Sequence, residues 1–187
     1  GEAAQGADRL RDLLRGGAAP ESFAGVDRGG DFLQTTGQGG AVGGLSDAQV
    51  QLRRRKVGDD IRSSARERAV HFLYEAESRN IAVSEVIKAQ ILTVDDLVVE
   101  LANGVESKRE ETDELISEFS HTWTIQRIPA IDRNILRLAI YELMVRADVP
   151  VAVVINEAVE LAKRFSTEES GKYVNGMLSA IAKRVRV

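Results

Sequence analysis

The sequence contains no cysteine, only three prolines and only two histidines among its 187 residues. Without cysteine there can be no disulfide scaffold, thiolate zinc site or cysteine nucleophile, and this absence fits a reducing compartment. Glu118 and His121 form one Glu-x-x-His pair of the kind found in di-iron bundles. Such a site needs a second pair, and Arg68 stands at the matching position before the other histidine, His71. We therefore expect no metal ion.

Long apolar runs are also absent. No stretch approaches the ~20 apolar residues that cross a bilayer, and residues 1–30 lack the basic start and apolar run of a secretory signal. We expect a soluble, cytoplasmic protein without a membrane partner. With a pI near 5.4, any contact with nucleic acid must come from a local basic patch.

The motifs of common enzyme classes are incomplete. "SGKY" at 170–173 has the Gly-Lys of a phosphate loop, but Ser166 replaces the first glycine and Tyr173 replaces the magnesium-binding hydroxyl residue. "GQGGAVGG" at 37–44 has no strand before it and no helix after it, so it does not predict a dinucleotide site. We expect no catalytic residue and no cofactor.

Glycine is concentrated at one end of the chain. Twelve of the sixteen glycines precede residue 52, and such a segment cannot bury enough apolar surface to offset its chain entropy. The composition predicts a flexible extension over residues 1–58 that ends in a basic arm. Within it, Asp8–Arg15 places Leu10, Leu13 and Leu14 at helical spacing, and so short a helix is stable only when it is docked.

From residue 59 to 187 the apolar residues recur with the period of amphipathic helices, and no run alternates as a strand would. The pattern predicts an all-α domain of six or seven helices. The segment "ILRLAIYELM" at 135–144 is apolar nearly all round, so it should form the most buried helix. The expected helices cover 59–79, 83–91, 95–119, a segment that starts at Pro129, 151–165, and a last segment opened by a capping box of Ser166 and Glu169.

The most basic stretch of this acidic chain is residues 53–69, which carries +4 while the remaining residues carry −8. Clustered lysine and arginine neutralise phosphates, whereas cations at a helix start oppose its macrodipole at a cost of ~0.3–1 kcal/mol each. This cost favours a functional, phosphate-binding role over a merely solubilising helix start. The seven cations are Arg53, Arg54, Arg55, Lys56, Arg62, Arg66 and Arg68.

These cations do not form one stripe. "RRRK" at 53–56 is expected on the flexible arm, outside the helix. Arg62 and Arg66 are four residues apart and share one side of the predicted helix, whereas Arg68 lies across the apolar stripe from them.

A second candidate surface is the start of the last helix. Lys172 and Tyr173 project from its first turns, where the helix dipole favours anions and a tyrosine ring can stack on an unpaired base. The alternative is that Tyr173 completes the edge of the core and Lys172 is an ordinary surface residue.

Three stretches resemble the NusB family of bacterial transcription antitermination factors, and the likeness runs in order over about residues 60–187. The resemblance implies a compact all-helical fold of two packed subdomains and a non-catalytic role. It also implies that the chain pairs with NusE, a ribosomal protein of the small subunit, and that the pair binds boxA RNA of ribosomal RNA operons. With other Nus factors, this pair helps the RNA polymerase elongation complex to read through terminators. The stretches are "SARERAVHFLYEAE" (64–77), "IPAIDRNILRLAIYELM" (128–144) and "DVPVAVVINEAVELAKRFSTEESGKYVNGML" (148–178).

The resemblance also assigns RNA-contacting residues. One departure concerns the first helix, where Ser63 and Ser64 stand in place of the cations of many relatives, so charge from residues 53–56 could substitute. We rank Arg62 and Arg66 above those four. The residues that match the family's RNA surface are Arg62, Arg66 and Arg68 in the first helix and Glu169, Lys172 and Tyr173 in the last.

Two alternatives stay open. One is the NusB-like RNA-binding domain of a ribosomal RNA cytosine methyltransferase, which requires a following catalytic domain with a cysteine nucleophile. The other is a helical interaction module that forms a homodimer and hides its own basic surface. The acidic remainder of the chain suits a basic protein partner such as NusE.

Overall fold

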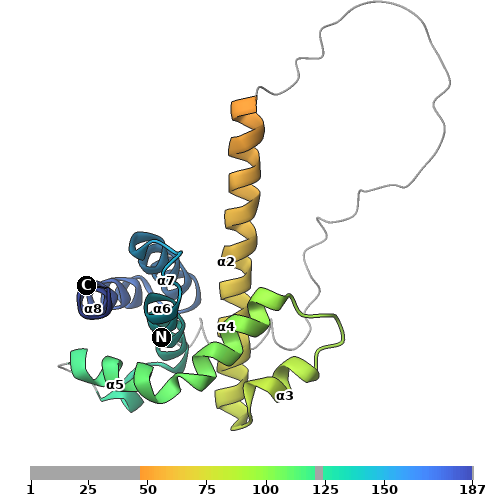
Figure 1. Ribbon diagram of the computed structural model, residues 1–187. Helices are drawn as coiled ribbons and strands as arrows, with labels where there is room; N and C mark the ends of the chain where they lie inside the picture. Colours follow the sequence, from red (N-terminus) through yellow and green to blue (C-terminus); the bar gives the residue numbers. More distant parts are fainter. Residues whose placement is uncertain (1–46, 121–123, 187) are drawn as a thin grey trace, which may run out of the picture.

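The structure is a computed structural model that describes residues 47–120 and 124–186, with the backbone alone at 47–57 and 59. The described part is all-α, as the sequence predicted, and contains seven α-helices, one short 3₁₀ helix and no strand (Figure 1). The elements are α2 (Asp47–Arg79), α3 (Val83–Lys88), α4 (Asp96–Ser107), α5 (Arg109–Phe119), η1 (Ile125–Arg127), α6 (Ala130–Val145), α7 (Val151–Phe165) and α8 (Glu168–Val185).

The central helix is α6, which packs against α2, α4, α5, α7 and α8. Every residue from Asn134 to Leu143 is buried, which confirms the prediction that this apolar segment forms the most buried helix. In Figure 1, α7 and α8 lie on one side of α6, while α2, α3 and α4 lie on the other. The core therefore has two groups of helices that share α6.

The first helix begins earlier than expected. We predicted a start at Asp59 or Asp60, and this was wrong, because α2 begins at Asp47. Residues 47–57, "DAQVQLRRRKV", contain no glycine or proline and include good helix formers such as Ala, Gln, Leu and Arg. Consequently the backbone of Arg53, Arg54, Arg55 and Lys56 is helical and does not form an arm outside the helix. Residues 1–46, including the predicted helix at Asp8–Arg15, lie outside the described residues.

The predicted long helix over 95–119 is two helices, α4 and α5, which meet at Lys108. Asp95 caps α4 as expected, and its Oδ1 accepts a hydrogen bond from the Leu97 amide at 2.9 Å. At Lys108 the backbone leaves helical geometry, with φ −107° and ψ 18°. The change of direction lets Asp113 of α5 reach Arg137 of α6, where two hydrogen bonds join them at 2.6 and 2.8 Å.

The start of α8 is capped one residue later than predicted. Ser166 ends α7, and the N-cap of α8 is Thr167, whose Oγ1 accepts from the Ser170 amide at 3.0 Å. The predicted capping box of Ser166 and Glu169 was therefore wrong. Ser170 also donates through Oγ to Oδ2 of the buried Asp132 at 2.8 Å, which ties the first turn of α8 to α6.

Among the described helices, none combines the length and apolar character that a bilayer crossing requires.

Candidate nucleic-acid interface

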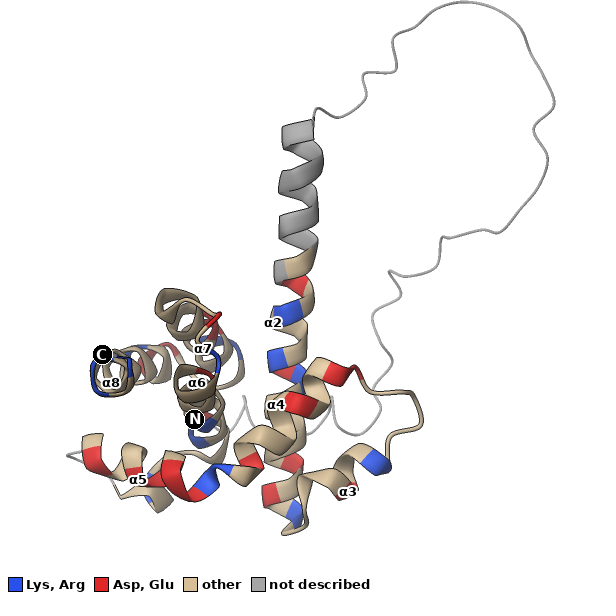
Figure 2. Ribbon diagram, viewed as in Figure 1, with Lys and Arg blue, Asp and Glu red and all other residues tan. Residues whose placement is uncertain are grey.

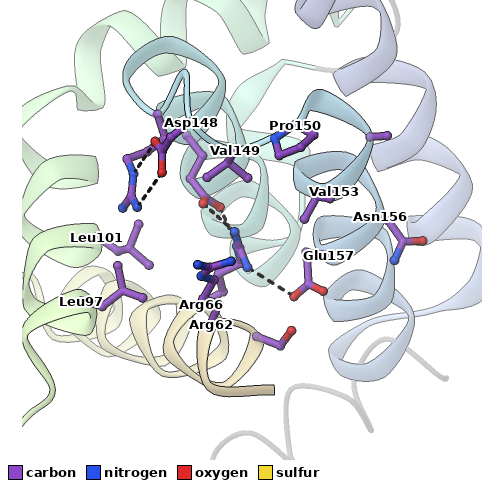
Figure 3. Close-up of a pocket in the computed structure, with 14 residues that line it drawn as sticks. Arg62, Arg66, Leu97, Leu101, Asp148, Val149, Pro150, Val153, Asn156 and Glu157 are labelled. Carbon is purple, nitrogen blue, oxygen red and sulfur yellow. Dashed lines mark hydrogen bonds and ion pairs between the residues drawn. The ribbon is translucent and has the colours of Figure 1, made fainter. Parts of the chain in front are cut away.

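A cleft of about 740 Å³ opens where the middle of α2 meets α4 and the start of α7 (Figure 3). Leu97 and Leu101 of α4 form one wall, and the segment that leads into α7 forms the other with Val149 and Pro150. The cleft therefore combines apolar walls with charged groups. Its charged lining residues are Arg62, Arg66, Glu142, Arg146, Asp148 and Glu157.

Arg66 lies on the inner side of this cleft and is only 5% exposed. Its Nε and Nη2 donate to the two carboxylate oxygens of Glu142 at 2.8 and 2.9 Å, and Nη1 lies 3.7 Å from Glu157. Burial by itself lowers the pKa of Arg66, but the hydrogen bonds and charge of Glu142, with the charge of Glu157, raise it overall. Arg66 and Arg62 line the same cleft, as their shared side of the predicted helix implied, but Arg66 is buried. A role for Arg66 in RNA contact stays a prediction.

Arg62 lies one turn before Arg66 and is exposed at the mouth of the cleft. The hydrogen bonds and charge of Arg146, with a smaller contribution from the charge of Arg62, lower the pKa of the Asp148 carboxyl. The position of Arg62 suits contact with a phosphate group, and that role stays a prediction.

Arg68 does not line the cleft. It is half-buried, and its guanidinium carbon lies 5.4 Å from the centroid of the Phe72 ring, so it forms a cation–π contact. The neighbouring Glu67 accepts a hydrogen bond from Arg164 at 2.6 Å, which links α2 to the end of α7. A role for Arg68 in RNA contact stays a prediction.

The first turns of α8 present the second candidate group. Lys172 is exposed and donates to Glu169, also exposed, at 2.6 Å, and this bond raises the pKa of Lys172. Tyr173 is half-buried, and its Oη lies 3.4 Å from Ser120 Oγ. The tyrosine thus packs at the edge of the core, as the alternative reading held, and also lines a surface hollow.

This hollow has a volume of about 350 Å³. Arg127 contributes a cation that the sequence analysis missed, because an isolated arginine in a predicted loop carries no periodic signal. Buried Asp132 also lines the hollow; burial raises its pKa, and its Oδ1 has no hydrogen-bond partner in the structure. The lining residues are Arg127, Ile128, Pro129, Asp132, Thr167, Glu169, Ser170 and Tyr173.

The cleft and the hollow share no lining residue, so the structure does not bring the two candidate groups into one pocket. They are connected by α7, which begins at the cleft and ends just before α8. Figure 2 shows Lys and Arg along the lower part of α2 and again on α8, with acidic residues between them. Any single strand that used both groups would therefore follow the surface along α7.

The side chains of residues 53–56 and His121 of the Glu-x-x-His pair also lie outside the described residues. Across the described ranges, no three His, Cys, Asp or Glu side chains are grouped so that they could hold a metal ion.

Comparison with known proteins identifies the family. The model of the NusB family matches residues 63–183, so Arg62 and the cations before it precede the match. The transcription antitermination protein NusB of Thermobifida fusca is 43% identical over 127 residues, which cover 66% of this chain and 89% of the relative. The corresponding protein of Myxococcus xanthus is 41% identical over 131 residues, which cover 65% of this chain and 94% of that protein.

Solved structures agree with these relatives. NusB of T. maritima superposes with a TM-score of 0.60 at 34% identity, over 65% of this chain and 90% of that one. A chain from a crystal structure of antitermination factors NusB and NusE in complex with dsRNA superposes with a TM-score of 0.57 at 30% identity, over 66% of this chain and 96% of that one. Because the family model spans more than half of the sequence and the fold agrees, the chain belongs to the NusB family.

Proposed function

We propose that the chain is a transcription antitermination factor that binds boxA RNA of ribosomal RNA operons together with NusE. The observation that carries the proposal is the likeness in sequence and fold to 96% of a chain solved with NusE and double-stranded RNA. The curated relatives, which are named for transcription antitermination, support the same role.

The exposed charges support an RNA surface at two places. Arg62 at the mouth of the cleft can pair with a phosphate, and the guanidinium can also form bidentate hydrogen bonds. At the start of α8, Lys172 adds a second cation beside the positive end of the helix dipole. Tyr173 borders the hollow there and offers a ring on which a base can stack.

The proposed binding of NusE is supported by the charge of the chain. The chain carries a net charge of −4, and residues other than 53–69 account for −8. A net negative charge of this kind attracts a basic ribosomal protein, because complementary potentials steer association. We infer that the pair acts on the RNA polymerase elongation complex with other Nus factors and that the chain itself makes or breaks no bond.

A mobility-shift experiment tests this proposal. Labelled boxA RNA and a scrambled RNA of equal length are titrated with the chain, each in the presence and absence of NusE. We expect weak binding to boxA by the chain alone, and tighter binding that discriminates against the scrambled RNA when NusE is present. Equal affinity for the two RNAs in the presence of NusE would overturn the proposal.

A further inference from the structure

The cleft between α2, α4 and α7 is lined in part by apolar side chains. Val153 of α7 lines it and is 43% exposed, and Ile61 of α2, beside Arg62, is 56% exposed. Ile61 lies outside the cleft lining, whereas Leu97, Pro150 and Val153 line the cleft and suit an apolar stripe of a short helix. A phosphate backbone would leave them in contact with water.

Carboxylates accompany this apolar surface. Asp148 and Glu157 line the cleft, and Figure 3 shows both directed toward its interior side chains. Arg146 donates to both carboxylate oxygens of Asp148 at 3.3 and 3.4 Å, and Nη1 of Arg66 lies 3.7 Å from Glu157, so the contacts of both carboxylates are long. Each carboxylate can therefore accept a further hydrogen bond from a basic ligand. The occupant that fits is an amphipathic helix with arginines beside its apolar stripe.

The chain contains such a segment at residues 8–15, "DRLRDLLR", outside the described residues. At about 100° per residue, a helix would place Leu10, Leu13 and Leu14 within an arc of roughly 100°. Arg9 would border this stripe on one side and Arg11 on the other, while the two aspartates of the segment would face away. This arrangement complements apolar walls flanked by Asp148 and Glu157.

The connecting chain has a suitable length. Residues 16–46 separate the segment from α2, and a glycine-rich linker of this size has an r.m.s. end-to-end distance of about 30 Å. From Asp47, the start of α2, to Arg62 at the cleft is about 22 Å along the helix. When linker length and span are similar, the effective concentration reaches roughly the millimolar range. Even if the segment binds the cleft weakly, it would then occupy the cleft for part of the time.

We propose that residues 8–15 dock as a helix in the cleft of their own chain, with the three leucines against Leu97 and Val153. Because Arg62 borders the cleft, the docked segment competes with RNA for this arginine. This competition rests on the proposed function, whereas the docking itself does not. A segment that occupies the cleft about half of the time weakens RNA binding at this site by about twofold.

The test uses paramagnetic broadening in the full chain. Since the protein has no cysteine, Ala18→Cys introduces a single site for a nitroxide label just after the segment. We expect broadening of the backbone amides of Leu97 and Val153, and its loss when Leu13→Asp is added. The matched control is Leu33→Asp, which places the same charge in the linker and should leave the broadening unchanged. Absence of broadening at the cleft, or broadening that Leu13→Asp does not remove, would overturn the proposal.

A mixing experiment distinguishes the segment of the same chain from that of a second copy. Isotope-labelled protein without nitroxide is mixed with nitroxide-labelled protein that carries no isotope. Broadening in this mixture would show that a second copy occupies the cleft and would contradict docking within one chain. The RNA experiment is separate: if Leu13→Asp abolishes the broadening without tightening boxA binding, the docking stands and the competition fails.

Discussion

Arg66 and Glu142 form a buried, two-pronged ion pair that fastens α2 to α6, with Nε to Oε2 at 2.8 Å and Nη2 to Oε1 at 2.9 Å. The pair lies beneath the mouth of the cleft, one helical turn from the exposed Arg62. We infer that Arg66 positions the middle of α2, and thus Arg62.

Arg66→Ala should lower the free energy of unfolding by about 3–5 kcal/mol, because it leaves the Glu142 carboxylate buried without its partner. Urea unfolding followed by circular dichroism measures the loss. The double variant Arg66→Met with Glu142→Leu removes both charges and should recover most of the stability. Arg62→Ala, at an exposed site, should change stability by less than about 0.5 kcal/mol. A fully stable Arg66→Ala protein would contradict the positioning role.

Gly104 is required where α4 crosses α6. A Cβ at this position would lie 2.3 Å from Cζ of the Tyr141 ring, which is itself buried. Gly104→Ala should therefore destabilise the protein by about 1–3 kcal/mol through overpacking, and thermal unfolding measures the effect. Gly176→Ala is the matched control in α8, where a Cβ meets nothing within 4 Å, and it should stabilise by roughly 0.5–1 kcal/mol. Equal effects of the two substitutions would refute this packing argument.

His71 should make stability depend on pH. Burial, helped by the charge of Arg164, lowers the pKa of His71 from 6.5 to about 4. Between these values the unfolded chain binds the proton and the folded chain does not, so stability falls as the pH is lowered from about 7 to 4. The contribution lost is at most about 3 kcal/mol.

Comparison of the unmodified protein with the His71→Gln variant isolates the contribution of His71 to the pH dependence of stability. Asp132, whose pKa is raised by burial, and Glu77, whose pKa is lowered by its arginine and asparagine partners, also titrate in the acid range. Their contributions are common to both proteins and cancel in the difference. Urea unfolding across this pH range should show a smaller pH slope for His71→Gln, and parallel curves would exclude His71 as the source.

The N-cap of α8 provides a further test, in which the expected loss of stability is smaller. Thr167→Ala removes the acceptor for the Ser170 amide and should cost about 1 kcal/mol of stability. Ser166→Ala should cost less, since Ser166 lies at the C-cap of α7 and caps no amide of α8. A larger loss in Ser166→Ala, measured by thermal unfolding, would restore the capping box predicted from the sequence.

The local spacing of apolar residues predicted the helices whose buried residues follow a regular pattern. The bounds of α7 at Val151 and Phe165 and the burial of α6 followed from the spacing of apolar residues alone. The break at Lys108 was missed, since it depends on contacts of α4 and α5 with α6 that a local pattern does not contain. The burial of Arg66 was missed for the same reason, because its partner Glu142 is 76 residues away in the chain.

At the site, charge and helix position predicted the exposed cations Arg62 and Lys172. They did not predict that Arg127 and the buried Asp132 border the hollow beside Tyr173. Asp132 of α6 meets Tyr173 of α8 through the packing of these two helices, which the sequence pattern does not specify, and Arg127 borders the hollow from η1.

The most direct test of the RNA surface is the salt dependence of boxA binding by the complex with NusE, measured for the unmodified chain, Arg62→Ala, Lys172→Ala and Lys183→Ala. Lys183 is an exposed lysine near the other end of α8 and serves as the matched control. We predict that Arg62→Ala and Lys172→Ala each lower the slope of log affinity against log salt by about one, and that Lys183→Ala leaves it unchanged. Equal slopes for all four proteins would contradict the proposed RNA surface at Arg62 and Lys172.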